Sequence, residues 1–182
     1  MRYPRETIYQ AFFTLVSGAT VSTPNGPQPA FKSASRWWQV YTDILPEEMP
    51  SLRIQQIGEN PRKTKTGVPY AWTLDVLLGV AVWAGQGIPN GVSPPWPASI
   101  INPVIDAIEA VLPGQTADPR GRTTLSLQAV PPGTPDPQLA AYRLYGDAGL
   151  VYDCAMVDSD HIFAGQVGNL AFAHIPCRIW AL

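Results

Sequence analysis

The sequence has little charge: only 14% of its residues are Asp, Glu, Lys or Arg, where about 25% is usual. Its net charge of −2 argues against a broadly basic nucleic-acid-binding surface. The same net charge is compatible with a channel through which nucleic acid slides, because strong pairing with phosphates would hold the polymer in place. A surface with so little charge also does little to keep single molecules apart in solution. The composition therefore favours a subunit of an assembly.

Cysteine is also scarce. The chain has two, Cys154 and Cys177, too few for a disulfide scaffold. If residues 151–158 and 169–181 pair as a hairpin centred near 165, these thiols lie almost opposite each other and a bridge is geometrically conceivable. We favour the interpretation that both thiols are reduced and buried.

No long apolar run is present. The longest nearly uninterrupted one, Val76–Ala84, is far below the ~20 residues that span a bilayer. The N-terminus leads straight into an amphipathic pattern without a signal peptide. We therefore expect no membrane association and a protein that stays in the cytoplasm in which it is made.

Catalytic signatures are missing too: the sequence has no GxxxxGKS/T loop, no GxSxG elbow and no CxxC pair. Asp158, Asp160 and His161 cluster at a predicted turn, where they could ligate a metal. Asp and Ser are ordinary turn residues, however, and no second cluster completes a coordination shell. His174 lies among apolar residues of a strand, which favours a packed histidine. We expect no enzyme, cofactor or metal, and keep a small metal- or ligand-binding domain as an alternative.

What the sequence does contain is a long alternation of apolar residues over positions 70–84, which predicts a β-strand. At about 3.3 Å per residue it would reach roughly 50 Å, against a typical ~5–6 residues. Such a strand would overhang a domain this small and contact something beyond its own core. A shorter strand, or two strands joined by a bend at Gly79, is the alternative.

Two stretches have the spacing of amphipathic helices. Residues 4–17 carry an apolar stripe that ends at Gly18, and the second helix lies within residues 98–112. Ser99, or Asn102 followed by a proline, supplies its start signal.

Period-two patterns predict the strands. Pro176 cannot donate to a ladder, so the last strand is expected at a sheet edge or bulged there. Only a turn is expected between residues 159 and 168. The predicted strands cover residues 31–40, 52–58, 70–84, 150–158 and 169–182, with a turn or short helix at 43–49.

This order of elements predicts an α+β fold: a mostly antiparallel β-sheet with two main α-helices packed on one face and long Pro/Gly-rich loops. Residues 1–182 are expected to form a single domain. Within it we expect a Pro-rich linker near residues 19–30 and a long loop near residues 113–149. Loops of that length are usually functional or mobile.

Basic residues gather just before the long strand. Residues 59–69 look like an extended hairpin loop that carries Arg62, Lys63 and Lys65. A solvated loop tip is one interpretation, and a finger that touches nucleic acid or an acidic neighbour is the other.

The chain also has six tryptophans. Those on predicted strands, including the Trp37-Trp38 pair, would be core residues or interface anchors. Carbohydrate stacking stays open as an alternative, whereas no basic–aromatic interleaving supports stacking on nucleic-acid bases.

The order of these pieces resembles that of the small tail terminator, or tail completion, proteins of long-tailed bacteriophages. In the second matching block a P-x-x-x-P-x-L turn runs from Pro46 to Leu52. The specificity lies in the order of the blocks, which together cover most of the chain. The blocks are RETIYQAFFTLVSG, FKSASRWWQVYTDILPEEMPSLRIQQIGE, GVPYAWTLDVLLGVAVWAG, INPVIDAIEAVL and GQVGNLAFAHIPCRIWAL.

The resemblance implies a twisted sheet flanked by helices and a homohexameric ring. Such a ring caps the major tail tube protein, docks on the head–tail connector or stopper protein, and leaves a channel for double-stranded DNA without sequence-specific binding. The role is structural, and the place is the tail and neck of the virion, assembled in the host cytoplasm. A stopper or adaptor protein of the neck is the alternative.

On this hypothesis the basic residues of the hairpin loop, Arg62, Lys63 and Lys65, contact a partner or the DNA in the lumen. The overhanging part of strand 70–84 and the edge strand 169–182 contribute to the ring contacts. The tryptophans expected between subunits are Trp72, Trp83 and Trp180.

Overall fold

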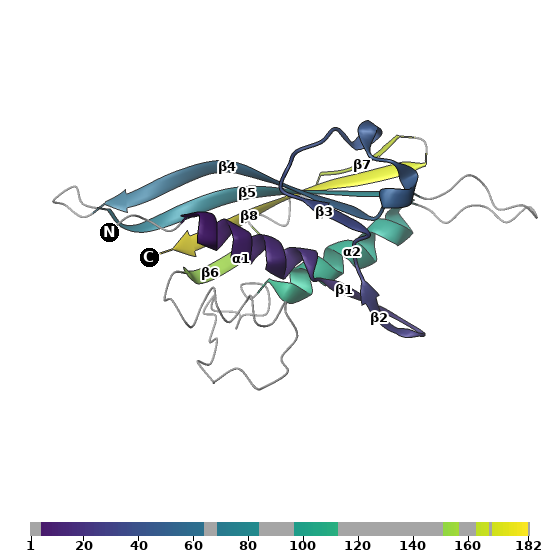
Figure 1. Cartoon of the computed structure of the whole chain (residues 1–182), viewed down its shortest axis with the longest axis horizontal. Coiled ribbons are helices and arrows are strands. Elements are labelled where there is room, and N and C mark those ends of the chain that lie inside the picture. Colours follow the sequence, from purple (N-terminus) through teal and green to yellow (C-terminus); the bar gives the residue numbers. More distant parts are fainter. Residues whose placement is uncertain are drawn as a thin grey trace, which may run out of the picture.

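The computed structural model describes residues 5–63, 69–83, 97–112, 151–156, 163–167 and 169–181. It is an α+β fold in which both helices lie on one side of a mostly antiparallel sheet, as the sequence predicts (Figure 1). In chain order the elements are α1 (Arg5–Ser17), β1 (Thr20–Thr23), β2 (Gly26–Pro29), β3 (Ser33–Ser35), two 3₁₀ turns η1 (Tyr41–Asp43) and η2 (Pro46–Glu48), β4 (Ser51–Lys63), β5 (Pro69–Trp83), α2 (Pro97–Val111), β6 (Val151–Met156), β7 (Phe163–Val167) and β8 (Leu170–Ala181).

The main sheet has the strand order β3-β4-β5-β8-β6, and β7 also pairs with β8. β3 runs parallel to β4, and every other pair is antiparallel. The prediction that the last strand lies at an edge is wrong, because β8 has β5 on one side and both β6 and β7 on the other. Pro176 falls in the gap between them, since β7 ends its pairing at His174 and β6 begins at Cys177. The missing N–H therefore interrupts no ladder on that side.

Strand β5 is continuous over 15 residues, so the long strand predicted from the alternation is confirmed. Gly79 introduces no bend, since it is paired with β4 on one side and β8 on the other. The expected overhang is wrong, because β4 and β8 are almost as long as β5 and accompany it nearly from end to end.

Three other regions differ from the prediction. Residues 19–30 form the β1–β2 hairpin, not a linker, and Gly26 takes a positive φ of 99° at its turn. Strand β4 continues to Lys63, so Arg62 and Lys63 end a strand where a loop was expected. β7 replaces part of the predicted turn. Lys65, the metal candidates Asp158, Asp160 and His161, and the predicted loop at 113–149 lie outside the described residues.

Helix α2 begins at Pro97, before either of the start signals proposed for it, and Pro103 lies inside the helix. Pro103 is exposed, so its ring lies on the solvent side while the opposite side stays apolar. Neither helix is long and apolar enough to cross a membrane, as judged on the described residues.

The main core lies between the helices and the sheet. Phe12 from α1, Ile108 from α2 and Val76 from β5 are fully buried there, and each such side chain stabilises the fold by about 1.5–3 kcal/mol. The predicted shared face of β8 is confirmed, since all six of its members are buried. They are Ala171, Ala173, Ile175, Cys177, Ile179 and Ala181.

The register bears on the two cysteines. Met156 lies opposite Cys177, and Cys154 lies opposite Ile179. The two cysteines are therefore offset by two residues, whereas the predicted hairpin placed them almost opposite each other. The thiol of Cys177 is buried.

Candidate functional site

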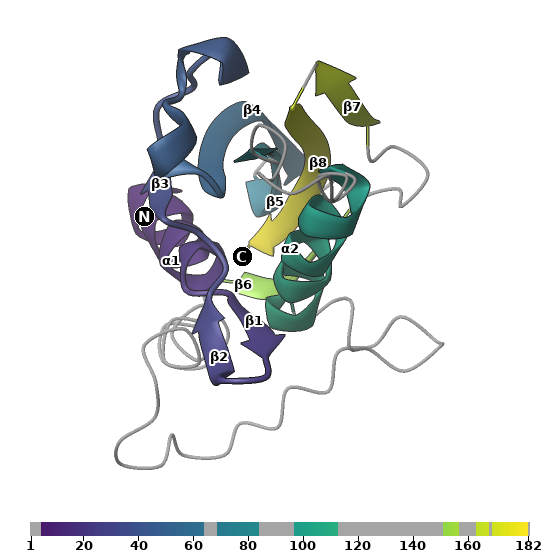
Figure 2. The same cartoon turned by 90° about the vertical axis from the view of Figure 1, so that its right-hand side faces the viewer.

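Among the described residues, the sheet face away from the helices is covered at one end only. After β3 the chain leaves the sheet, and residues 36–50, here called the covering segment, pass over this face through η1 and η2 (Figure 2). A prediction of strand for residues 31–40 is therefore right only for Ser33–Ser35. A second, smaller apolar cluster forms under the covering segment, from Ile44, Met49, Ala81 and Leu170, with Tyr41 against it.

Gly79 receives the aromatic side chains of the covering segment. A Cβ atom at Gly79 would lie 2.8 Å from Oη of Tyr41 and 3.1 Å from Cη2 of Trp38. Those distances are shorter than van der Waals contact, so only glycine allows the rings to lie this close to the strand. Tyr41 in turn stacks on Phe172 with ring centroids 5.0 Å apart.

His174 completes this aromatic cluster. Its ring centroid lies 5.5 Å from that of Trp38 and 5.4 Å from that of Tyr41. Oη of Tyr41 and Nε2 of His174 are buried without a hydrogen-bond partner among the described residues. Because burial disfavours the charged form of each group, it raises the pKa of Tyr41 and lowers the pKa of His174. Both side chains are therefore neutral at pH 7, and His174 is packed, as predicted.

A buried arginine fastens the covering segment to the sheet. Arg53 of β4 is 5% exposed, and its Nε and Nη2 donate to Oε1 of Gln39 at 3.3 and 3.2 Å. Nη1 donates to Oγ of Ser33 at 3.3 Å and to the carbonyl of Leu52 at 3.1 Å. The nearest carboxylate oxygen, on Glu48, is 4.0 Å from Nη2. Arg53 therefore joins β3, β4 and the covering segment through hydrogen bonds.

The other end of this face has no such cover in the described residues. Here Nε of Arg178 donates to Oδ1 of Asp75 at 2.6 Å, which raises the pKa of Arg178, and Nδ2 of Asn60 donates to Oδ2 of Asp75 at 3.3 Å. Leu77 and Pro176 are partly exposed beside them. This surface combines apolar groups with polar groups that already have partners, which suits contact with another protein.

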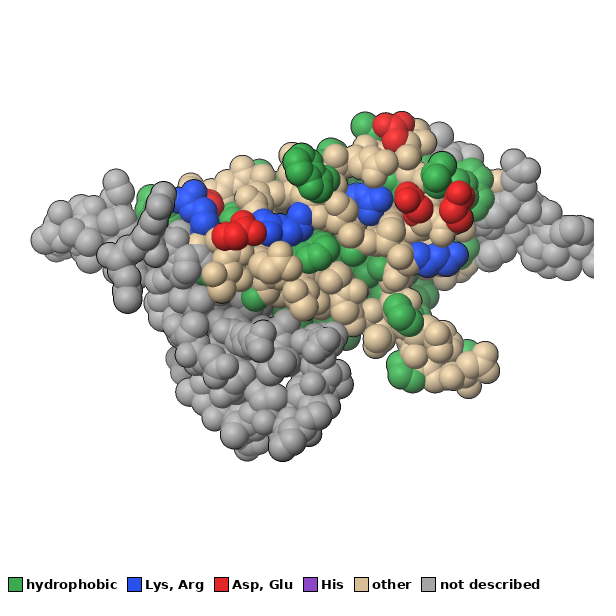
Figure 3. Space-filling model, viewed as in Figure 1, with side chains coloured by type: hydrophobic (Ala, Val, Ile, Leu, Met, Phe, Trp, Pro, Cys, Tyr) green, Lys and Arg blue, Asp and Glu red, His purple; other side chains and the backbone are tan. Residues whose placement is uncertain are grey.

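Several large apolar side chains are exposed on β4 and the covering segment. Trp37 is 83% exposed, and Ile57, which sits at a bulge in β4, is 58% exposed. Val40 and Leu45 are more than half exposed as well. Single exposed apolar residues are normal, but all four of these belong to β4 or to the covering segment. In Figure 3 hydrophobic side chains reach the surface between scattered charges of both signs.

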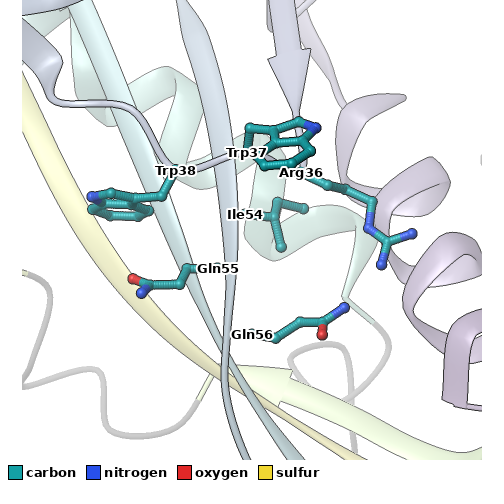
Figure 4. Close-up of a pocket in the computed structure, with 6 residues that line it drawn as sticks. All are labelled: Arg36, Trp37, Trp38, Ile54, Gln55 and Gln56. Atoms are coloured by element: carbon teal, nitrogen blue, oxygen red, sulfur yellow. The ribbon is translucent and has the colours of Figure 1, made fainter.

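A hollow of about 450 Å³ lies where the covering segment separates from β4. β3 pairs with β4 only as far as Arg53, so the outer edge of β4 is open from Ile54 onward in the described part of the chain. Figure 4 shows Trp37 above Ile54, with Arg36 turned toward a helix. Arg36 is held there by Glu6, with Nη2 3.1 Å from Oε2. The hollow is lined by Arg36, Trp37, Trp38, Ile54, Gln55 and Gln56.

The three tryptophans predicted at subunit contacts do not form one surface. Trp72 is half-buried and packs against the main core. Trp180 is half-buried near the same end of the sheet, whereas Trp83 is 36% exposed at the other end. The most exposed indole among the described tryptophans belongs to Trp37. Adjacent residues of a strand point to opposite faces of the sheet. The Trp37-Trp38 pair in the predicted strand therefore already indicates that one of the two indoles lies outside the core.

No protein-family model matches this chain, and no curated protein matches it either.

Proposed function

We propose that this protein is a structural subunit of a bacteriophage virion, a tail terminator that assembles with copies of itself into a ring. The ring caps the tail tube, joins it to the head connector and leaves a channel for DNA. The order of the sequence blocks supports a tail terminator. The exposed surface supports a subunit that assembles with other chains.

One observation favours assembly above the others: in the described part of the chain no strand pairs with the outer edge of β4 beyond Arg53, and the indole of Trp37 stands 83% exposed beside it. An unpaired strand edge is a template for pairing with another chain. Exposed tryptophans are frequent anchors of protein interfaces. The β4 edge and the exposed Trp37 therefore form a surface suited to binding another chain. A ring forms when one such contact repeats from subunit to subunit until it closes.

The low charge supports the same proposal. With 14% charged residues and a net charge of −2, a ring of this protein would carry few groups that hold phosphates. DNA could then pass through the lumen, because the affinity of proteins for DNA depends mainly on phosphate contacts by Lys and Arg.

The direct test is to purify the protein and record its native mass spectrum and negative-stain images, alone and with assembled tail tubes of its virus. Rings, either free or at the ends of tubes, are the expected result. A protein that stays monomeric in the presence of tubes refutes the proposal. Labelling assembled particles separates the neck components, because a terminator stays with headless tails and a stopper stays with heads.

A further inference from the structure

The main sheet has an open edge at each margin. On one side β4 has no neighbouring strand along Ile54–Lys63, and on the other β6 has only β8 beside it, as far as the described residues go. A strand at the edge of a sheet presents one side of its backbone to a further strand, which is the requirement for adding one.

These two edges lie level with each other across the sheet. One row of paired residues runs from Pro61 through Trp72 and Ala181 to Val151. Another runs from Gln56 through Val76 and Cys177 to Met156. The whole of β6 is therefore level with residues 56–61 of β4, inside the stretch that β3 leaves open.

The strand directions are also compatible. β4 is antiparallel to β5, β5 to β8, and β8 to β6, so β4 and β6 run in opposite directions. A second copy placed beside the first, with its strands in the same sense, brings its β6 antiparallel to β4. Antiparallel pairs form the more stable ladder.

We propose that β6 of one copy pairs with the open edge of β4 of the next copy, so that the sheets become continuous around an assembly. This inference rests on the proposed ring, and it names the contact that closes it. The contact joins two different surfaces, which is the kind of interface that generates rings, whereas pairing of β4 with β4 would end at a dimer. The occupant of the β4 edge is therefore a second copy of this chain.

Charge and shape agree with this occupant. By sequence, β6 has a single charged residue, Asp153, while β4 ends in Arg62 and Lys63, and opposite charges on neighbouring strands stabilise their pairing. The exposed side chains of Trp37 and Ile57 flank the β4 edge and would be covered by the neighbouring copy.

The test uses cysteines placed in one row. Asn60 is paired with Thr73, Thr73 with Trp180, and Trp180 with Asp153. Across a continuous sheet, Asn60 and Asp153 of neighbouring copies would have Cβ atoms about 4.5–5.5 Å apart without stagger, near the range that a disulfide accepts. The double variant Asn60→Cys with Asp153→Cys is made in a Cys154→Ser background. Two further pairs combine Asp153→Cys with Gly58→Cys or with Arg62→Cys in place of Asn60→Cys. They allow for a shift of two residues in either direction in the register between the two copies.

Mild oxidation of the assembled protein should give a ladder of dimers, trimers and higher species on a reducing-agent-free gel with at least one of the three pairs. Each single-cysteine variant should give no ladder, and neither should Asp153→Cys combined with Gln28→Cys, which lies on the separate β1–β2 hairpin. Circular dichroism confirms that each variant is folded.

Rings without a ladder in any pair overturn the β4–β6 contact while leaving the proposed ring intact. Dimers alone also overturn it, because they indicate a symmetric contact. Monomers that persist with tail tubes present overturn both proposals. A second measurement needs no variant: in rings of the wild-type protein, amide exchange at residues 54–60 and 151–156 should slow by about tenfold or more relative to the monomer, and unchanged exchange in both segments refutes the contact.

Discussion

The two faces of the sheet are made by the same strands but are completed in different ways. On the helix side, β5 and β8 present apolar residues that α1 and α2 bury almost completely. On the other side, a short covering segment without α-helix or long strand closes one end through an aromatic cluster, Arg53 and Gly79. The first face therefore supplies most of the stability, while the second depends on a few specific contacts and leaves surface for a partner.

The largest effect on stability is expected from the helix side. Phe12→Ala removes a side chain that is fully buried, so the free energy of unfolding should fall by about 3–5 kcal/mol in urea titrations followed by circular dichroism. Phe13→Ala is the matched control, because Phe13 is only partly buried against the same core. Equal losses from the two variants would contradict the assignment of this face as the main core.

A smaller loss is expected from Gly79→Ala. The new methyl group would meet Oη of Tyr41 and the ring of Trp38, and overpacking of this kind costs about 1–3 kcal/mol. Gly58→Ala is the control on the neighbouring strand, since nothing lies within 4 Å of its Cβ position, and its effect should stay within about 0.5 kcal/mol. If both variants behave alike in urea titrations, the close approach at Gly79 is not what holds the covering segment.

The aromatic cluster should also make stability depend on pH. The pKa of His174 is lowered by burial, so below about pH 6.5 the unfolded chain binds more protons than the folded protein. The free energy of unfolding should therefore fall as the pH drops below that value, and level off below the folded pKa.

His174→Phe keeps a ring in the cluster and removes the titration. Among the described side chains, the rings packed against His174 are those of Trp38, Tyr41 and Phe172. The titratable one of these three, Tyr41, is neutral in this range. The difference in unfolding free energy between the variant and the wild type, measured from pH 8 to about pH 5, should grow as the pH falls. A difference that is independent of pH would contradict this prediction.

The smallest effect on stability is expected from Trp37→Ala. Because this side chain is 83% exposed, the free energy of unfolding should change by less than about 0.5 kcal/mol. Assembly should weaken much more, by about 2 kcal/mol if the indole anchors the interface, as measured by native mass spectrometry over a concentration series. Trp38→Ala is the control with the opposite pattern, since Trp38 packs on Tyr41 and His174. Unimpaired assembly of Trp37→Ala would remove this residue from the interface.

Sequence periodicity predicts the helix side well. The alternation in residues 70–84 and the shared face of the last strand both come from burial against helices, and burial on one face is what produces a period of two. The helix ranges follow for the same reason. The start of α2 is the exception, because Ser99 and the Asn102-Pro103 pair both resemble start signals but lie inside the helix.

The other face was poorly predicted because its contacts join residues far apart in the chain. The role of Gly79 depends on Tyr41 and Trp38, and the role of Arg53 depends on Gln39. Neither contact produces a periodic pattern in the sequence. The β1–β2 hairpin differs from the predicted linker because the prolines around it outweigh the Asn-Gly turn signal in the sequence. The edge position predicted for β8 is wrong because Pro176 lies in the gap between two separate neighbouring strands, β6 and β7.

That gap has a mechanical consequence. β6 and β7 occupy the same side of β8 but meet different halves of it, on either side of Pro176. Among the described residues no ladder of backbone hydrogen bonds joins β6 to β7 directly. The hydrogen bonds of each strand therefore carry load only to its own half of β8, and the other link between the two strands is the covalent chain itself. One half of the margin can therefore give way under load while the other half keeps its pairing.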